Sequence, residues 1–318
     1  MRTASARYLW LVLAMFPVFW LMMSGASYFL AVTKCDAHPS SNDAYIAYCL
    51  DREYGDFEHE AFYFGLNNTG RSLAESQVLF LGNSKMQYAF SRDNVAPFFE
   101  ERNVRFFVMG FGHGEQSRFP ELVLQRHPAR PALAIINVDP FFTDGITEPA
   151  AFPVQHPIAG YVDAVYKSVM QMPRAWICRH WANPLLCEGQ PAMMRSEITG
   201  QWNVAQFKPD PDPPYPTQPV ARMADAALHQ WLTRASIIAP EFLKTLKARC
   251  VVFTAVPSDA GKVYAELLGR QLGVRFISPD VTDLSTIDHI HLDGRSAVAW
   301  SNAFLRQLDS IGRECGAW

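Results

Sequence analysis

Two short segments near opposite ends of the chain carry residue types that could form a nucleophilic site. An apolar run at 79–81 breaks at Gly82-Asn83 before Ser84, and the segment 288–291 sets Asp288 three residues before His291. A serine hydroxyl becomes a nucleophile when a histidine takes its proton and an acid orients that histidine. The sequence therefore predicts Ser84 as nucleophile, His291 as general base and Asp288 as orienting acid.

The elements around these residues follow an alternating pattern. Apolar runs of strand length lie at 77–81, 104–110, 132–138, 250–256 and 274–277. They are continuous rather than alternating in polarity, which is typical of strands buried on both faces of a parallel sheet. Helical patterns separate them, at 91–102, 115–125, 220–249, 260–272 and 294–311. This alternation predicts a three-layer α/β fold.

Such a fold can bring the two segments together. In doubly wound sheets, reactive groups sit at the carboxyl ends of the strands. Ser84 directly follows the first predicted strand, and His291 lies in a loop between the last strand and the last helix. A serine at a turn is also an ordinary cap or turn-former, so the serine gains its meaning only from the histidine segment.

These segments resemble two sequence blocks of the SGNH (GDSL-like) hydrolase superfamily. Gly82-Asn83-Ser84 is similar to the family's Gly-Asp-Ser block, with Asn in place of Asp, and Asp288-x-x-His291 is similar to its terminal Asp-x-x-His block. The resemblance covers roughly 77–144 and 249–311. It implies a flavodoxin-like parallel sheet with helices on both faces, and serine-dependent acyl chemistry that needs no cofactor and no metal.

The family's other two blocks supply an oxyanion hole, and here the match is partial. The second block implies Gly114, in the glycine-rich segment 109–115, with an ordinary turn as the alternative. The third block, normally Gly-x-Asn-Asp, departs, so the oxyanion asparagine is Asn137, or its role is lost or taken by Asp139. A carboxylate there disfavours an oxyanion unless it is protonated or turned away. His113 is a candidate pocket residue, with a surface imidazole as the alternative.

The N-terminal region predicts a membrane anchor. Residues 8–32 contain no charged side chain and exceed the roughly 20 residues that a spanning helix needs. Arg2 and Arg7 precede this run, so the bias of positive charge puts residues 1–7 in the cytoplasm and the bulk of the chain outside. A cleaved signal peptide that ends near 24–26 is the alternative. We expect a connector at 33–76 and a main domain at 77–318, with a proline-rich insertion at about 145–219.

Cysteine content and charge narrow the class of protein further. The six cysteines suit an oxidising compartment and suggest the pairs 35–49, 178–187 and 250–315, with buried free thiols as the alternative. No CxxC motif or Cys/His zinc spacing is present, and a metal cluster at Asp288, His289 and His291 lacks a second group of ligands. A net charge of −3 argues against nucleic acid as a partner.

The anchor and the altered third block resemble the membrane-anchored SGNH-like proteins of bacterial cell-envelope polysaccharide modification, such as alginate O-acetylation and teichoic-acid D-alanylation. This resemblance implies a domain on the periplasmic or extracellular side of the cytoplasmic membrane. There it would transfer an O-acyl group to a polysaccharide, or remove one, alongside a membrane-bound O-acyltransferase. Two alternatives stay open: a lipase or carbohydrate esterase acting alone, and a non-catalytic protein that binds a glycan or the acyltransferase.

Overall fold

A computed structural model describes most of the chain after the N-terminal region. The described residues are 10, 12–19, 22, 34–36, 43–139, 141–181, 187–217, 225–257 and 261–318. Residues 1–7 and much of the predicted anchor at 8–32 lie outside them, although 12–19 are helical. Within the described ranges, no helix is long and apolar enough to cross a membrane. The signal anchor stays a prediction.

A five-stranded parallel sheet forms the centre of the fold, as the apolar runs predict. Its strands are β2 (Val78–Asn83), β3 (Phe106–Phe111), β4 (Leu133–Asn137), β7 (Cys250–Thr254) and β8 (Arg275–Ile277). They are ordered β3-β2-β4-β7-β8, and every neighbouring pair is parallel. This is one of the common doubly wound orders, in which chain direction across the sheet reverses beside the first strand. The crevice expected at that reversal lies at the carboxyl ends of β2 and β4.

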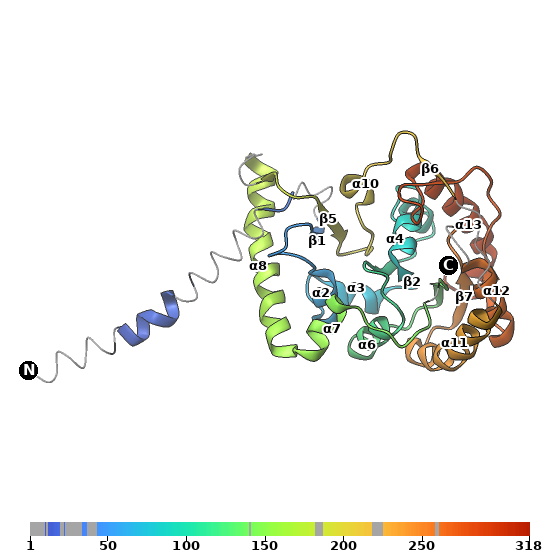
Figure 1. The fold of residues 1–318 in the computed structure, drawn as a ribbon, viewed down its shortest axis with the longest axis horizontal. Helices are drawn as coiled ribbons and strands as arrows, with labels where there is room; N and C mark the ends of the chain where they lie inside the picture. The colour runs from blue at the N-terminus through green and yellow to red at the C-terminus, as the bar shows by residue number, and fades with distance from the viewer. Residues whose placement is uncertain are drawn as a thin grey trace, which may run out of the picture.

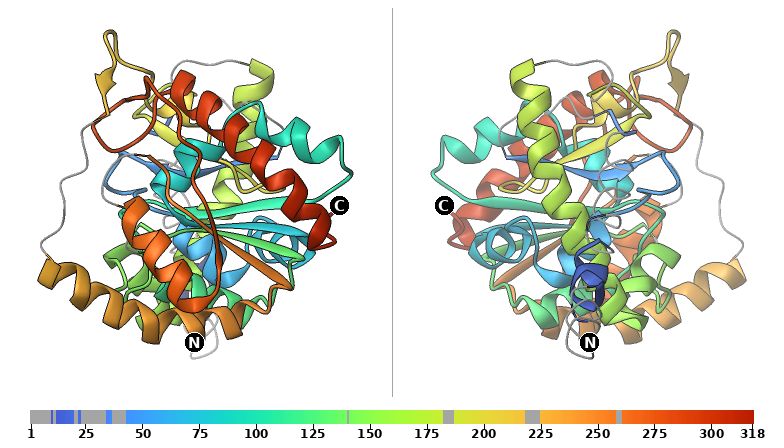
Figure 2. Two further views of the ribbon diagram at one scale, coloured as in Figure 1. Left: turned by 90° about the vertical axis from the view of Figure 1, so that its right-hand side faces the viewer. Right: turned by 90° about the vertical axis from the view of Figure 1, so that its left-hand side faces the viewer.

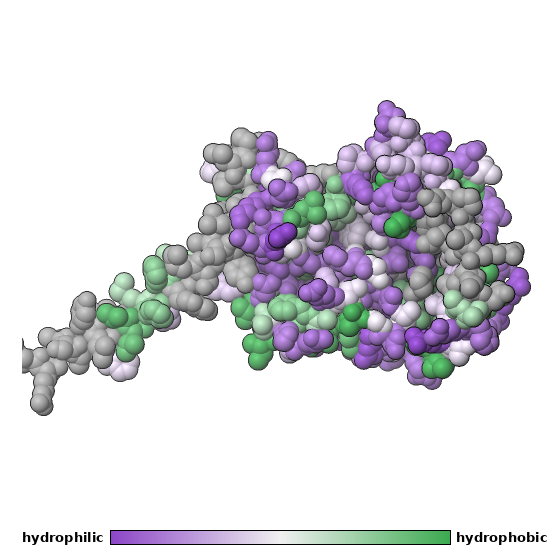
Figure 3. All heavy atoms as spheres, in the orientation of Figure 1, coloured by the Kyte–Doolittle hydropathy of each residue, from purple (hydrophilic) through white to green (hydrophobic). Residues whose placement is uncertain are grey.

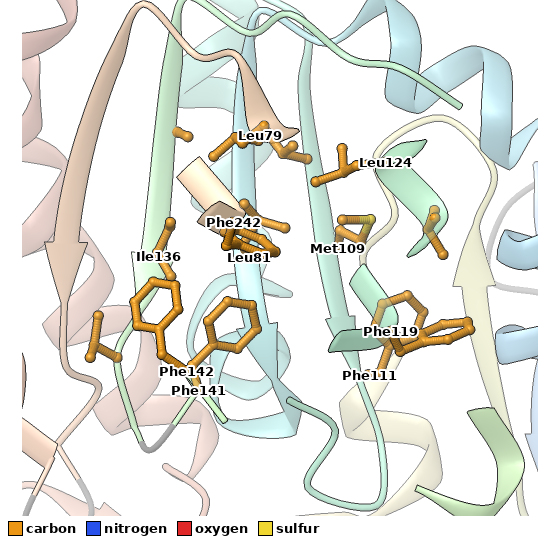
Figure 4. Close-up of a cluster of buried hydrophobic side chains, with 14 of the residues drawn as sticks. Leu79, Leu81, Met109, Phe111, Phe119, Leu124, Ile136, Phe141, Phe142 and Phe242 are labelled. Carbon is orange, nitrogen blue, oxygen red and sulfur yellow. The ribbon is translucent and has the colours of Figure 1, made fainter. Parts of the chain in front are cut away.

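Helices cover both faces of this sheet (Figures 1 and 2). One face carries α4 (Ser84–Phe90), α5 (Val95–Glu100) and α13 (Gly294–Glu314), and the other carries α3 (Thr69–Glu75), α6 (Arg118–Arg126), α11 (Asp225–Leu246) and α12 (Gly261–Leu272). Alternate residues of β2 serve the two faces: Leu79 and Leu81 pack into one apolar cluster, and Val78 and Phe80 into the other. Figure 4 shows the first cluster, in which Phe242 of α11 reaches the strands. The three-layer α/β prediction is confirmed at this level.

The predicted connector and insertion also contribute regular structure to the folded unit. The connector holds β1 (Ala44–Cys49) and α2 (Glu58–Phe64), and the insertion holds α7 (Glu148–Gln155), α8 (Pro157–Trp181), β5 (Ala192–Ser196), α10 (Val204–Phe207) and β6 (Tyr215–Pro216). Strands β1 and β5 pair antiparallel in a small second sheet, and β6 pairs with β9 (Ser285–Thr286). Segments far apart in the sequence therefore form one wall beside the main sheet.

Three disulfides fasten the structure, and they are the three pairs that the sequence suggests. Cys35 joins Cys49, Cys178 joins Cys187 and Cys250 joins Cys315. The last of these ties the first residue of β7 to the end of α13. Disulfides of this kind persist in oxidising compartments, which is consistent with an exported protein.

Candidate active site

Ser84 stands on a tight turn from β2 into α4. Gly82 leaves room for a close approach near the end of β2, because a Cβ there would lie 3.0 Å from Met86 Cβ and 3.1 Å from Asn137 Cβ, which is tighter than ordinary contact. Asn83 then caps α4, since its side-chain oxygen accepts a hydrogen bond from the Lys85 N–H at 3.0 Å. Ser84 is thus the first residue of a helix and lies at the carboxyl end of the strand, where the sequence predicts it.

His291 is held by a second turn, between β9 and α13. The Asp288 carboxylate accepts the backbone N–H of His291 at 2.9 Å and that of Ile290 at 3.2 Å, which closes the turn. The next element is fixed by Asp293, whose side chain accepts the Ser296 N–H at 2.7 Å and so caps α13. The short Asp-x-x-His segment therefore builds its own turn and delivers the imidazole to the edge of the sheet.

The three predicted side chains form one chain of hydrogen bonds. His291 Nε2 lies 2.8 Å from Ser84 Oγ, and His291 Nδ1 lies 2.9 and 3.1 Å from the two carboxylate oxygens of Asp288. With Nδ1 protonated and donating to Asp288, Nε2 has the lone pair that can accept the serine proton. The Tyr88 ring packs against the imidazole with ring centres 4.3 Å apart, which limits rotation of the histidine.

Asp288 remains ionised in this setting. Partial burial opposes the charge, but the hydrogen bonds from His291 and Lys208 hold the pKa of Asp288 well below its usual range. The Lys208 ammonium lies 2.9 Å from the carboxylate. An ionised Asp288 can therefore orient a neutral imidazole and stabilise the imidazolium that forms when Ser84 loses its proton.

The serine opens into a cavity of about 310 Å³. Its lining combines apolar and aromatic side chains with a few polar groups, a mixture that is typical of small-molecule sites. The lining residues are Tyr48, Leu50, Asp56, Glu58, Ser84, Tyr88, Gly112, His113, Met193, Trp202, Phe207, Lys208, Asp288 and His291. All three triad members and His113 thus share one space.

A buried chain of acids and imidazoles supports His113. His113 Nε2 lies 3.4 Å from Asp56 Oδ2, and the other carboxylate oxygen of Asp56 lies 2.9 Å from His59 Nδ1. The opposite ring nitrogen of His59 lies 3.4 Å from Glu115. Its hydrogen bond with Asp56 raises the pKa of His113 above the ordinary value, with burial opposing the shift. The cavity therefore contains a second imidazole, which favours the protonated, hydrogen-bond-donating form.

Three hydrogen-bond donors hold the carboxylate of Glu58 beside this cavity. Its carboxylate accepts hydrogen bonds from Arg195 at 2.7 Å, from the Trp202 indole at 2.9 Å and from the Gly112 N–H at 3.0 Å. Glu58 and Arg195 are almost completely buried, and the Arg195 guanidinium also lies over the Phe62 ring. This ion pair fixes the wall between the connector, the insertion and the glycine-rich loop after β3.

Asp56, Glu58 and His59 also stand close enough to share a metal ion, with ligand atoms within 4.8 Å of one another. The Arg195 guanidinium already neutralises Glu58, and Asp56 and His59 already bond each other. We therefore read the three as a charge network. At the other cluster considered from sequence, Asp288 and His291 bond each other, while the His289 ring packs on Tyr215 with centres 4.4 Å apart.

The residues expected to form an oxyanion hole do not gather at the cavity. Gly114 is exposed with a left-handed backbone and is not part of the lining. Asn137 is fully buried, and its side-chain oxygen accepts the Val256 N–H at 2.9 Å. Asp139 is turned toward Lys85, with which it forms a buried ion pair. The Lys85 ammonium therefore balances the charge of the Asp139 carboxylate, which would otherwise repel an oxyanion. His113, the candidate pocket residue, does line the cavity.

Several lining residues escaped the sequence analysis because they come from segments without a motif. Asp56 and Glu58 belong to the predicted connector, and Phe207 and Lys208 belong to the insertion. The pairing of β1 with β5 joins these two segments, and the residues could have been found only by predicting that pairing. Nothing local in the sequence shows that pairing.

The fold and the site together define a doubly wound α/β protein with a serine–histidine–aspartate hydrogen-bond chain at the reversal point of its sheet. Comparison of the chain with known protein families, with curated proteins and with solved structures finds no match. The resemblance to SGNH hydrolases rests on the two short sequence motifs alone.

Proposed function

We propose that this protein is a serine-dependent O-acyl transferase or O-acyl esterase that acts on an exported or cell-envelope polysaccharide. The observation that carries the proposal is the hydrogen-bonded Ser84, His291 and Asp288 in a partly apolar cavity. Segments far apart in the sequence bring these three side chains together. A serine with a neighbouring base and an orienting acid is an arrangement used for acyl transfer.

The proposed reaction has two halves. Ser84 Oγ attacks the carbonyl carbon of an acyl ester while its proton passes to His291 Nε2. The tetrahedral oxyanion then collapses, the bond from carbon to the leaving oxygen breaks, and that oxygen takes the proton from Nε2. In the second half, an acceptor hydroxyl gives its proton to Nε2 and attacks the acyl carbon, and Ser84 Oγ leaves and regains the proton. A sugar hydroxyl as acceptor gives transfer, and water gives hydrolysis.

A second hollow supports a sugar as the acceptor. It has a volume of about 790 Å³ and shares Trp202 with the catalytic cavity. Its lining is rich in side chains that can hydrogen-bond hydroxyl groups: Asp43, Ser91, Arg92, Asp93, Glu100, Ser196, Thr199, Gln201 and Asn203. Such groups suit a polyhydroxylated ligand, and Trp202 adds an aromatic surface to the same hollow. The suggested acyl source is a membrane-bound O-acyltransferase beside the predicted anchor.

The experiment combines p-nitrophenyl acetate as acyl donor with a mixture of neutral and acidic oligosaccharides as acceptors. The wild-type protein should release p-nitrophenol and add acetyl groups to a sugar, or release acetate, and Ser84→Ala should do neither. Ser310→Ala, a change to an exposed serine of α13 that lines neither hollow, is the matched control that should retain activity. Equal turnover by wild type and Ser84→Ala would refute the proposal.

A non-catalytic role is the second candidate, and one observation favours it. The Gly112 N–H in the cavity wall, which could face an oxyanion, is already bonded to Glu58. If the lack of this donor prevents attack by Ser84, the folded protein binds an oligosaccharide in the two hollows without forming an acyl-enzyme. Calorimetric titration with the same oligosaccharides distinguishes this case, because binding would persist in Ser84→Ala while wild type shows no turnover.

A further inference from the structure

The 25-residue helix α8 has its polarity reversed relative to an ordinary surface helix. Surface helices bury an apolar stripe and expose charged residues. Half of the buried positions of α8 are polar and long, namely Lys167, Gln171 and Arg174, and the other half are the small residues Gly160, Ala164 and Cys178. The exposed positions include Ile158, Val169, and Met172, which are 83, 48 and 66% exposed. The sequence of α8 is thus built for a polar interior and an apolar exterior.

Each buried polar residue of α8 has a defined task. Lys167 lies 2.7 Å from Asp163 and donates to the Asp56 carbonyl at 3.0 Å. Gln171 accepts the Ile46 N–H at 2.8 Å and donates to the Ile46 carbonyl at 3.1 Å. These contacts fix the rotation of the helix, so the apolar side cannot turn inward.

The outward side carries an apolar stripe, which we call the α8 stripe. Its large members are Ile158, Tyr161, Val162, Val169, Met172 and Trp176, and the Trp181 ring packs against Trp176 at the end of the helix. Between positions 157 and 176, every exposed residue of α8 is uncharged. Figure 1 shows α8 as an outer edge of the molecule, and in Figure 3 hydrophobic residues gather over α7 and the lower part of α8. Large exposed apolar patches of this kind mark surfaces that bind a partner or a membrane.

The residues that follow the predicted anchor lie against α8, and this indicates what the α8 stripe contacts. The apolar run ends at residue 32, and Cys35 is bonded to Cys49. The Cys35 carbonyl accepts a hydrogen bond from Arg174 of α8. The predicted membrane span would therefore emerge within a few residues of α8, which brings the stripe to the bilayer surface.

Composition points the same way. Trp and Tyr, which the stripe contains, are the residues enriched at membrane–water interfaces. Trp176 also lines a hollow of about 310 Å³ that contains two cations suited to a lipid phosphate, Arg174 and Arg179, and one carboxylate, Glu197. The Nε and Nη1 atoms of the buried Arg174 have no hydrogen-bond partner among the residues that the structure describes.

We propose that the α8 stripe lies in the surface of the lipid bilayer, as a second membrane contact besides the N-terminal anchor. Trp176 and its neighbours would enter the boundary between headgroups and acyl chains, as interfacial amphipathic helices do. The contact would hold the folded domain in one orientation to the membrane. This inference is independent of the chemistry at Ser84.

The test uses the full chain in vesicles of phosphatidylethanolamine and phosphatidylglycerol. A photo-crosslinking amino acid replaces Val169 or Met172 in the α8 stripe, and Val263 in the control. Val263 is the matched control because it is also a helical valine, in α12, and it is 51% exposed against 48% for Val169. After irradiation, mass spectrometry measures the lipid adduct at each position.

The expected result is a lipid adduct at positions 169 and 172 that clearly exceeds that at 263. Two results would overturn the proposal. One is a yield at 169 and 172 no higher than at 263. The other is a crosslink that joins two copies of the chain, or that joins α8 to another protein in native membranes, which would make the stripe a protein interface.

Discussion

His291 Nε2 lies 2.8 Å from Ser84 Oγ, although the two residues are 207 positions apart in the sequence. The contact depends on two independent turns, one that follows β2 and one that precedes α13. Each turn is closed by its own acidic or amide side chain, Asn83 in the first and Asp288 in the second. The site is therefore assembled by the sheet rather than by any single local motif.

Replacing Asp288 with Asn should slow acylation of Ser84 strongly. A carboxylate can only accept a hydrogen bond from Nδ1–H, whereas the amide can also donate one to Nδ1. The imidazole then carries its proton on Nε2 and cannot accept the proton of Ser84. A loss of about 10²- to 10⁴-fold is expected for an orienting acid. Stopped-flow release of p-nitrophenol measures it. Asp283→Asn, at an exposed position nearby, is the control and should react like wild type; equal rates for the two variants would argue against the role of Asp288.

His113 should assist acylation through a hydrogen bond to the developing oxyanion. Gly114 and Asn137 do not line the cavity, whereas His113 does, and its bond with Asp56 raises its pKa and favours the donating imidazolium. His113→Leu should lower kcat by about 10²- to 10³-fold, in the range of a lost oxyanion donor. His113→Gln has a similar size and keeps an N–H donor, so it should retain more activity. If Leu and Gln behave alike, His113 has only a structural role.

Removing Arg195 should destabilise the fold, because Glu58 would be left as a buried carboxylate without a counter-ion. Breaking one partner of a buried ion pair typically costs about 3 to 5 kcal/mol. The free energy of unfolding of Arg195→Met, from urea titration, should fall by that order. The double variant with Glu58→Gln removes the stranded charge and should recover part of the loss. A double variant less stable than the single one would show that the pair's charges are not the cause.

His59 should make stability depend on pH in the alkaline range. Burial alone would lower its pKa, but the charge of Asp56 and hydrogen bonds with Asp56 and Glu115 raise it to about 10 from an ordinary value of 6.5. The folded state therefore holds a proton that the unfolded state releases. The resulting stability is fully present below about pH 6.5 and is lost as the pH rises toward 10.

Thermal unfolding of wild type and His59→Gln across this pH range tests that dependence. Other titrating groups are common to both proteins, so the difference between their unfolding temperatures isolates His59. The gap should narrow steadily from pH 6.5 upward. A constant gap would mean that the imidazole is neutral in the folded protein.

The sequence predicts those parts of the structure that local patterns encode. The five apolar runs become the five strands of the parallel sheet, within a few residues of the expected bounds. Ser84 and the Asp288-x-x-His291 segment also have local causes, a glycine-permitted close approach in the first and a self-closing turn in the second. Both segments therefore lie where their patterns predict.

Contacts between distant segments were not predictable in the same way. Gly114 and Asn137 have the right residue types in the right loops, but loop backbone and side-chain direction decide whether they reach the cavity. Glu58 and Arg195 meet only because β1 pairs with β5, and neither segment carries a motif. The reversed polarity of α8 likewise becomes visible only when burial shows which side faces the protein.

The most direct test of the central claim is intact-mass spectrometry after treatment with a fluorophosphonate. The reagent phosphonylates a serine only where a neighbouring base activates the hydroxyl and fluoride can leave. We expect one adduct on the wild-type protein, mapped to Ser84, absent in Ser84→Ala and formed far more slowly in His291→Ala. A folded wild-type protein that forms no adduct, or one whose adduct survives in Ser84→Ala, would contradict it.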